Sequence, residues 1–243
     1  MGTLMSAGEF WTAYKPFVIT FVIMAVLVFA LMLLLQYARH QAEEELGKLL
    51  DSDANLYLER LENNNRLALV FRKPVLLLYK LTGYMEIGND IEIRNIIGLL
   101  DSMKLEPRDK VEYLQKRMSF FVSTGDSVEA KASFERLSGY LHSVKADEVD
   151  RYRVLLDEGA EIIRVYLDRD VSYMDELKEK AAGTGHPVLR GVMYFRLAKL
   201  AHFKGDAQER EKYLALASET LSGTYYEEII IKARLAPEIL ETK

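Results

Sequence analysis

The four histidines are the first residues to test for chemistry, because histidine ligates metals and transfers protons near neutral pH. They are His40, His142, His186 and His202. No two of them lie at a metal-ligand spacing, the motif H-E-x-x-H is absent, and the chain has no cysteine. We therefore expect no metal site.

Other catalytic motifs are also missing. The sequence has no glycine-rich phosphate loop after a strand and no G-x-S-x-G motif, and Gly183-Thr184-Gly185 is typical of a linker between two helices. The 37 acidic residues include carboxylates that could act as acids or bases, but acidic residues spread over helix faces usually serve solvation. We expect no enzyme activity and no cofactor.

The charge balance argues against nucleic acid as a partner. The chain has 243 residues and a net charge of −5, and the part after His40 holds 30 basic and 36 acidic residues. An acidic domain without a basic stripe lacks the electrostatic footprint that phosphates require. We expect no nucleic-acid binding.

Residues 17–35 form an apolar run in which Thr20 is the only exception. As a helix they would extend about 28 Å, close to the roughly 30 Å hydrocarbon core of a bilayer. The flanking residues are of the types found at membrane interfaces, namely Trp11, Tyr14, Lys15, Tyr37 and Arg39. The run is longer than the apolar stretch of a cleaved signal, and no A-x-A pattern follows it. We expect an uncleaved, single-pass transmembrane helix, with a buried core helix and a cleaved signal as the alternatives.

The sequence leaves the orientation of this helix open. Lys15 stands on one side and Arg39 and Lys48 on the other, a count that slightly favours a cytoplasmic domain. A short head at 1–16, an uncleaved span and a long following domain form the usual layout of a signal anchor whose domain crosses the membrane. We favour a cell-membrane protein with an extracytoplasmic domain over one with a cytoplasmic domain.

The rest of the chain has helical periodicity, and we expect no strands. One apolar stripe recurs every three or four residues, at Leu46, Leu50, Ala54, Tyr57 and Leu61. It predicts that residues 36–65 form a stalk or first helix that continues the transmembrane helix. A homodimeric coiled coil through this stalk is an alternative, although five positions are fewer than sustained heptads require.

A recurring turn divides the remaining residues. The segments 88–92, 125–129 and 205–209 each contain Gly, then Asp or Asn, then Glu three residues later. Glycine can take the left-handed conformation that ends a helix, Asp or Asn caps the next helix, and Glu can return a bond to the cap residue. The spacings of 37 and 80 residues, with a further step at 167–170, predict helical hairpins.

The predicted architecture is all-α, a transmembrane helix followed by an α-solenoid of about four hairpins over 66–243. We expect the paired helices at 66–81 with 90–103, 107–123 with 127–142, 148–167 with 172–182, and 188–204 with 207–221. A final capping helix is expected at 225–241, where the capping box Thr224 to Glu227 begins it.

Two of these hairpins resemble the tetratricopeptide repeat. In one, Ala130 and Phe134 follow the turn Gly125-Asp126, and in the other a set of small and large residues surrounds Gly205-Asp206. That set is Leu197, Ala198, Ala201, Leu214 and Ala217. The chain departs from the family pattern at Arg210, where alanine is usual, in the missing closing proline, and in a pitch above 34 residues.

The resemblance implies a concave groove, lined by the first helices of the hairpins, that binds a segment of a partner protein. The family's groove positions correspond to Glu112, Gln115, Ser119, Phe195, Lys199 and His202. The alternative is that Phe195 is a core residue and the others are solvated.

The expected function is a membrane-anchored scaffold or adaptor for other proteins, in envelope assembly or translocation in bacteria. It resembles bitopic tetratricopeptide-repeat proteins, in which the anchor supplies local concentration. The alternatives are a self-associating structural spacer and a cytoplasmic-facing regulatory module on the membrane.

Overall fold

The computed structural model describes residues 7–143 and 146–241, and it describes side chains from Lys15 onward except those of Pro16, Val18 and residues 146–151. Within these residues the chain is all-helical and has no strand, as the periodicity predicts. It divides into two compact units, Met1–Leu105 and Glu106–Lys243. We describe each unit by itself.

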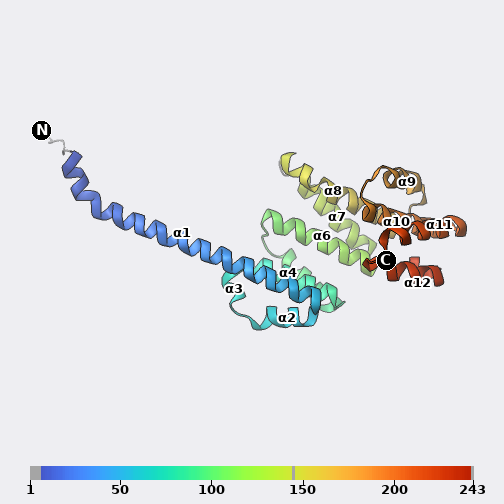
Figure 1. Cartoon of the computed structure of the whole chain (residues 1–243), viewed down its shortest axis with the longest axis horizontal. Coiled ribbons are helices and arrows are strands. Elements are labelled where there is room, and N and C mark those ends of the chain that lie inside the picture. The colour runs from blue at the N-terminus through green and yellow to red at the C-terminus, as the bar shows by residue number, and fades with distance from the viewer. Residues whose placement is uncertain (1–6, 144–145, 242–243) are drawn as a thin grey trace. The chain divides into compact units, whose positions relative to one another are not determined.

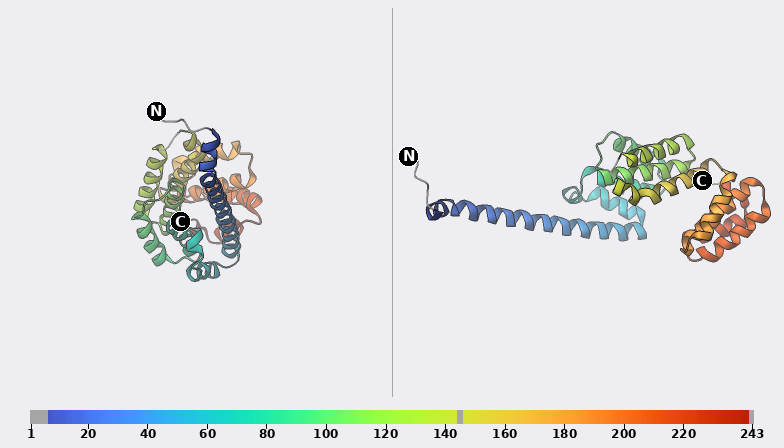
Figure 2. Two further views of the ribbon diagram at one scale, coloured as in Figure 1. Left: turned by 90° about the vertical axis from the view of Figure 1, so that its left-hand side faces the viewer. Right: turned by 90° about the horizontal axis from the view of Figure 1, so that it is seen from above.

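The first unit contains the long N-terminal helix and four shorter ones. These are α1 (Ala7–Ser52), α2 (Ala54–Asn63), α3 (Leu67–Val70), α4 (Lys73–Glu86) and α5 (Asp90–Asp101). Figures 1 and 2 show α1 as one continuous helix whose C-terminal part packs with the other helices of this unit. Their core includes Leu46, Tyr57, Leu61 and Phe71.

Helix α1 is long and apolar enough to cross a membrane. Its most apolar window, within Ile19–Ser52, has no residue buried inside the protein, which separates it from the core helix of a globular domain. Tyr37 and Lys15 are exposed, and Arg39 forms an ion pair with Glu43 at 2.9 Å. Trp11 and Tyr14 belong to α1, but their side chains lie outside the part of the chain that the structure describes.

The prediction of one helix across the apolar stripe at 46–61 is wrong. The backbone of Asp53 is extended, and its carboxylate accepts hydrogen bonds from Asn55 N (2.8 Å) and Leu56 N (3.2 Å), so it ends α1 and caps α2. Helix α2 then packs against α1. The apolar residues therefore form one stripe on α1 and another on α2, and the two stripes face each other. Leu46 of α1 and Leu61 of α2 are buried in the same core.

The helix expected at 66–81 is also interrupted. Helix α3 ends at Val70, and extended backbone at Phe71 and Arg72 precedes α4. Pro74 lies in the first turn of α4, where its missing N–H has no partner to lose. A helix running through from Val70 would place Pro74 in its interior, where its ring clashes with the preceding turn and its missing N–H removes a hydrogen bond, so the helix starts again at Lys73.

The second unit begins with a helical hairpin and ends in a bundle. Its elements are α6 (Pro107–Thr124), α7 (Ser127–His142), α8 (Ala146–Ile162), the π-helical turn η1 (Ile163–Leu167), the 3₁₀ turn η2 (Val171–Tyr173), α9 (Met174–Gly183), α10 (Pro187–Lys204), α11 (Ala207–Leu221), α12 (Tyr225–Leu235) and the 3₁₀ helix η3 (Pro237–Glu241). The expected final helix at 225–241 is thus divided at Ala236, where Pro237 cannot continue it.

The three predicted glycine turns are confirmed. Gly88, Gly125 and Gly205 have φ of 67°, 77° and 78°, the left-handed region that glycine occupies at no steric cost. The next residue caps the following helix each time, as when Asp206 Oδ1 accepts from Glu209 N at 2.9 Å. The predicted return bond from Glu is replaced at Glu129 and Glu209 by ion pairs with basic side chains of neighbouring helices.

Helices α10 and α11 form the centre of the second unit's core. Their close approach requires Gly191, since an added Cβ would lie 2.6 Å from Leu221 Cγ. Leu197, Ala198 and Leu214 are fully buried. Packing in this core determines which side chains of α10 and α12 point toward α6 and α8.

Candidate functional site

A cleft in the second unit is the strongest candidate site. Its volume is about 230 Å³, and α6, α8 with η1, α10 and α12 each contribute to its walls. The lining residues are Ser119, Val122, Ser123, Glu158, Ile162, Tyr166, Arg196 and Tyr226. Segments separated by more than a hundred residues therefore meet at one polar and aromatic surface.

Arg196 forms the charged floor of this cleft. Its side chain is 6% exposed, and its Nη1 donates to Glu161 Oε1, which is also buried. Its Nη2 lies 3.5 Å from Glu158 Oε1, at the exposed edge of the cleft. Among the described residues, Arg196 Nε has no hydrogen-bond partner. A buried guanidinium needs such paired carboxylates to offset its desolvation.

Glu161 is held in place from its other side. Tyr173 OH donates to Glu161 Oε2 at 2.8 Å, and Lys180 Nζ donates to Tyr173 OH at 2.6 Å. Burial alone would lower the pKa of Lys180, but its hydrogen bonds to Tyr173 and Glu176 outweigh burial and raise that pKa. The network holds Glu161, and through it Arg196, in a fixed position by contacts from α8, η2 and α9.

Tyr166 enters the cleft from the π-helical turn. In this turn Asp168 N donates to Ile163 O at 2.9 Å, a span of five residues. Such turns are found frequently at functional sites. Burial raises the pKa of Tyr166, so its phenol stays protonated and can donate a hydrogen bond to a ligand.

One of the predicted groove residues, Ser119, lines the cleft and is exposed. Glu112 and Gln115 lie earlier on α6, are half-buried, and are not among the lining residues. Glu112 forms an ion pair with Lys116 at 3.7 Å. Helix α6 therefore takes part in the cleft through its C-terminal half.

The predicted groove residues of α10 lie elsewhere. Phe195 and Lys199 are buried, and the Phe195 ring packs on the Tyr226 ring with centroids 5.5 Å apart. His202 is half-buried and lies 3.2 Å from Glu241. The neighbouring residue Arg196 reaches the cleft, and one residue corresponds to about 100° of rotation around a helix.

Seven of the eight lining residues were not predicted from the sequence, among them Arg196, Glu158 and Tyr226. Arg196 carried a signal, because it is a charged residue between Phe195 and Leu197 in an apolar helix, and such a residue is buried only with a partner. Glu158 is one of many acidic residues, and nothing in its local sequence separates it from a solvated one.

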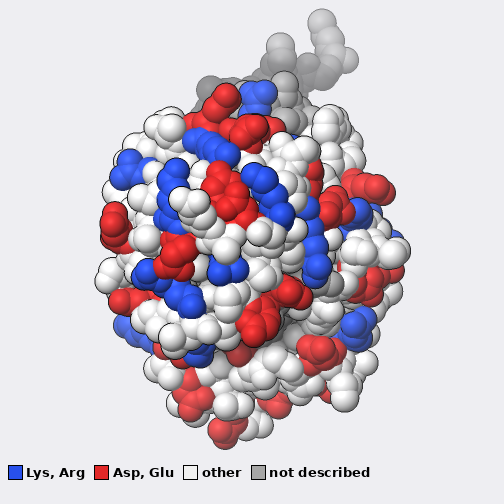
Figure 3. All heavy atoms as spheres, turned by 90° about the vertical axis from the view of Figure 1, so that its right-hand side faces the viewer, with Lys and Arg blue, Asp and Glu red and all other residues white. Residues whose placement is uncertain are grey.

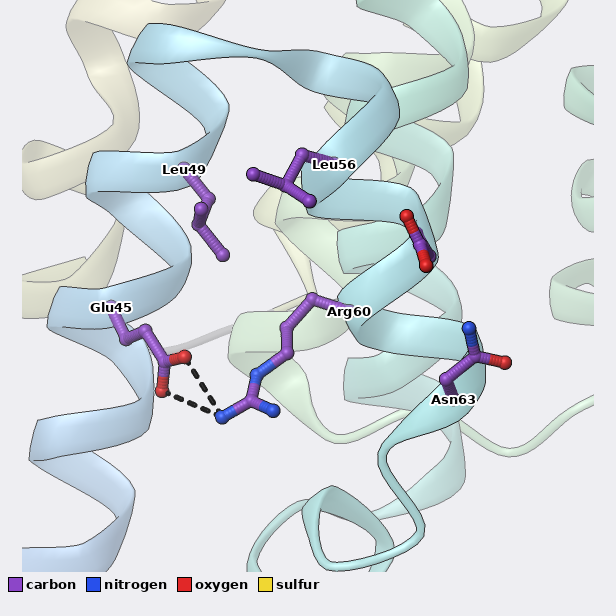
Figure 4. Close-up of a pocket in the computed structure, with 6 residues that line it drawn as sticks. Glu45, Leu49, Leu56, Arg60 and Asn63 are labelled. Atoms are coloured by element: carbon purple, nitrogen blue, oxygen red, sulfur yellow. Dashed lines mark hydrogen bonds and ion pairs between the residues drawn. The ribbon is translucent and has the colours of Figure 1, made fainter.

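A second, shallower cleft lies between α1 and α2 in the first unit. Its volume is about 370 Å³, and Figure 4 shows Arg60 of α2 extending toward Glu45 of α1, with Leu49 and Leu56 further along the two helices. Arg60 Nη2 lies 2.8 Å from Glu45 Oε1, and both side chains are roughly half exposed. An ion pair in such a setting contributes at most about 1 kcal/mol, so this cleft is the weaker candidate.

The cleft at Arg196 has the chemistry of a binding site. It offers hydroxyl groups, one exposed carboxylate and two aromatic rings, and among the described residues no group of three or more His, Cys, Asp or Glu could hold a metal ion. No protein-family model, curated protein or solved structure matches the chain.

Proposed function

We propose that this chain is a membrane-anchored interaction protein that binds a segment of a partner protein in the Arg196 cleft. In this proposal α1 is a signal anchor, the rest of the chain is extracytoplasmic, and the protein scaffolds other proteins at the membrane surface. The cleft itself carries the proposal, because four segments converge on a rigid floor formed by Arg196 and Glu161. A site that is fixed before binding loses little entropy when it binds.

The size and chemistry of the cleft favour a peptide side chain as the occupant. Pockets for small-molecule ligands are usually about 300–1,000 Å³, whereas this cleft is about 230 Å³. Tyr166 and Tyr226 supply amphipathic surface, and Ser119 and Ser123 supply adaptable hydrogen bonds. Aromatic residues of this kind are enriched at protein interfaces.

The surface charge is compatible with a protein partner. Figure 3 shows acidic and basic side chains interspersed on one face of the molecule. A mixed surface of this kind favours neither a phosphate backbone nor a strongly charged substrate.

The paired helices support a tetratricopeptide-like organisation of the second unit. Helices α6 and α7 pack together, as do α10 and α11. The small family positions Ala130, Ala198 and Ala201 are fully buried, as close packing within a hairpin requires. In this class of fold the hairpins present one continuous surface to a partner.

Site-specific photocrosslinking tests the proposal. A photoreactive amino acid at Ser119 in the full chain, irradiated in native membranes, is expected to give one discrete adduct with another protein. Ser123→Trp should fill the cleft and reduce this adduct about tenfold, the effect of losing a central anchor.

Ser143→Trp is the matched control. Ser123 and Ser143 are both exposed, and each hydroxyl donates to the carbonyl three residues earlier, at 2.8 Å and 2.6 Å. The control should leave the adduct unchanged. Equal adducts in the two variants would contradict a site in the cleft, and an adduct with a second copy of this chain would favour a self-associating spacer.

A further inference from the structure

A basic segment of the first unit lies beside the end of the apolar run in α1. Residues 63–85 contain no acidic side chain and four basic ones, Arg66, Arg72, Lys73 and Lys80, in a chain of net charge −5. The segment includes the end of α2, all of α3 and most of α4. Its net charge is therefore opposite to that of the whole protein.

Contacts with α1 place this segment close to the membrane end of the unit. Helix α3 packs against α1, and the guanidinium of Arg39 lies over the Phe71 ring, 5.7 Å from its centroid. Arg39 follows Leu35, the last residue of the apolar run, by about 6 Å along the helix axis. Figure 1 shows α3 nearer than α2 or α4 to the N-terminal half of α1. The α3 segment thus lies at the height where lipid headgroups would surround α1.

The side chains of α3 are divided between the core and solvent. Leu67 and Phe71 are buried in the core of the first unit, and between them Leu69 is 79% exposed. Arg66, Arg72 and Lys73 are exposed on either side of Leu69. An apolar side chain flanked by cations is the pattern of elements that lie in a membrane interface.

We propose that α3 and its flanking residues dock on the surface of the bilayer that α1 spans. Leu69 enters the interface, and Arg66, Arg72 and Lys73 bind anionic lipid headgroups. Juxtamembrane basic residues are attracted by the negative surface potential of such lipids. This inference rests on the proposed membrane span of α1. The docked α3 segment would be a second, lipid-dependent contact between the first unit and the membrane.

A single fluorescent label tests this docking. Because the chain has no cysteine, Leu69→Cys gives one site for an environment-sensitive dye in the full chain, reconstituted in nanodiscs. In nanodiscs with about 30% phosphatidylglycerol, iodide quenching of the dye is expected to fall about threefold relative to phosphatidylcholine alone. Ile91→Cys is the control, since Ile91 is 73% exposed and lies in the first turn of α5, which follows the end of α4 that is distant from α3 in sequence.

Charge reversal tests the role of the basic residues. The triple variant Arg66→Glu, Arg72→Glu, Lys73→Glu should abolish the protection of the Leu69 label in anionic nanodiscs. The variant Lys104→Glu, Arg153→Glu, Lys212→Glu changes the net charge equally at exposed positions outside the segment, and it should keep the protection. Loss of protection in both variants would show a nonspecific charge effect and overturn the assignment.

A label inside the apolar run separates failure of this inference from failure of the anchor. A dye at Val28→Cys that iodide quenches freely would show that α1 does not span the bilayer, and the proposed function would fall with it. A protected Val28 label together with an equally quenched Leu69 label in both lipids would overturn the docking alone. Protection of Leu69 that disappears at one chain per nanodisc would assign the surface to a second copy and also overturn it.

Discussion

At the scale of single residues, Lys199 is a charged side chain that the sequence places at a binding surface and the structure buries in the core. It was expected in a groove, but it is 3% exposed, and its ammonium lies 4.7 Å from the centroid of the Tyr166 ring. Burial, together with the positive charge of Arg169, lowers its pKa to about 8. A charged lysine at this position therefore opposes folding at neutral pH.

We predict that Lys199→Met stabilises the protein at pH 7 by about 1 to 3 kcal/mol. The substitution removes the cost of burying the charge, which corresponds to the lowered pKa, but it also removes the favourable contact between the ammonium and the Tyr166 ring. The unfolded chain holds its proton up to a pKa near 10.4, so the wild-type protein gains stability as pH rises from about 8 to about 10.5. The variant should lack this gain. Chemical denaturation of the full chain in detergent at pH 7, 9 and 10.5 measures it.

Lys212→Met is the control for this prediction. The Lys212 ammonium also lies near a ring, 5.3 Å from the centroid of Tyr213, but its side chain is exposed. Its replacement should leave the pH dependence of unfolding unchanged. The same slope in wild type and in Lys199→Met would show that Lys199 is not the group responsible.

At the scale of elements, Asp53 decides how the first unit is built. Its amide donates to Leu49 O at 2.7 Å in the last bond of α1, and its carbonyl accepts from Tyr57 N at 3.0 Å in the first turn of α2. One residue thus ends a helix of 46 residues and begins the next.

We predict that Asp53→Ala weakens α2 by about 1 kcal/mol, the usual cost of losing a side-chain cap. Hydrogen exchange of the α2 amides should become about fivefold faster. Asp51→Ala, at an exposed position in the last turn of α1, should leave the exchange of α2 unchanged. Unaltered exchange in Asp53→Ala would mean that packing alone holds α2 in place.

The elements that sequence predicts well are those with local causes. The turns at Gly88, Gly125 and Gly205 need only a left-handed glycine and a capping side chain, and both are visible in a few residues. The break at Asp53 was missed because the apolar period continues through it, and periodicity cannot distinguish one helix from two that pack face to face.

The candidate site was harder to predict than the fold. Ser119 was expected and lines the cleft, but the face of α10 that reaches the cleft depends on how α12 and α8 pack against it. Those contacts bury Phe195 and direct Arg196 outward from the core. A local motif carries no information about such neighbours, so the residue of α10 that reaches the cleft cannot be identified from the sequence of α10 alone.

At the scale of the whole molecule, the apolar run supplies a test of anchoring. We predict that Val28→Arg, near the middle of the run, reduces membrane insertion of the full chain, because a central arginine costs about 2.5 to 3.5 kcal/mol on insertion scales. Tyr37→Arg, beyond the end of the run, should insert as wild type does. Recovery in the carbonate-resistant membrane fraction measures insertion, and equal recovery of the two variants would contradict a span centred on Val28.

The continuity of α1 has a mechanical consequence. No break separates the apolar run from the 17 residues between Leu35 and Ser52, and the last of these pack directly against α2. This part of α1 is a continuous helical segment about 25 Å long. A 10° change in the tilt of the helix, such as a thinner bilayer induces, would move the turn at Asp53 sideways by about 4 Å. In the proposed transmembrane arrangement, the position of the turn at Asp53 would therefore depend on the thickness of the bilayer.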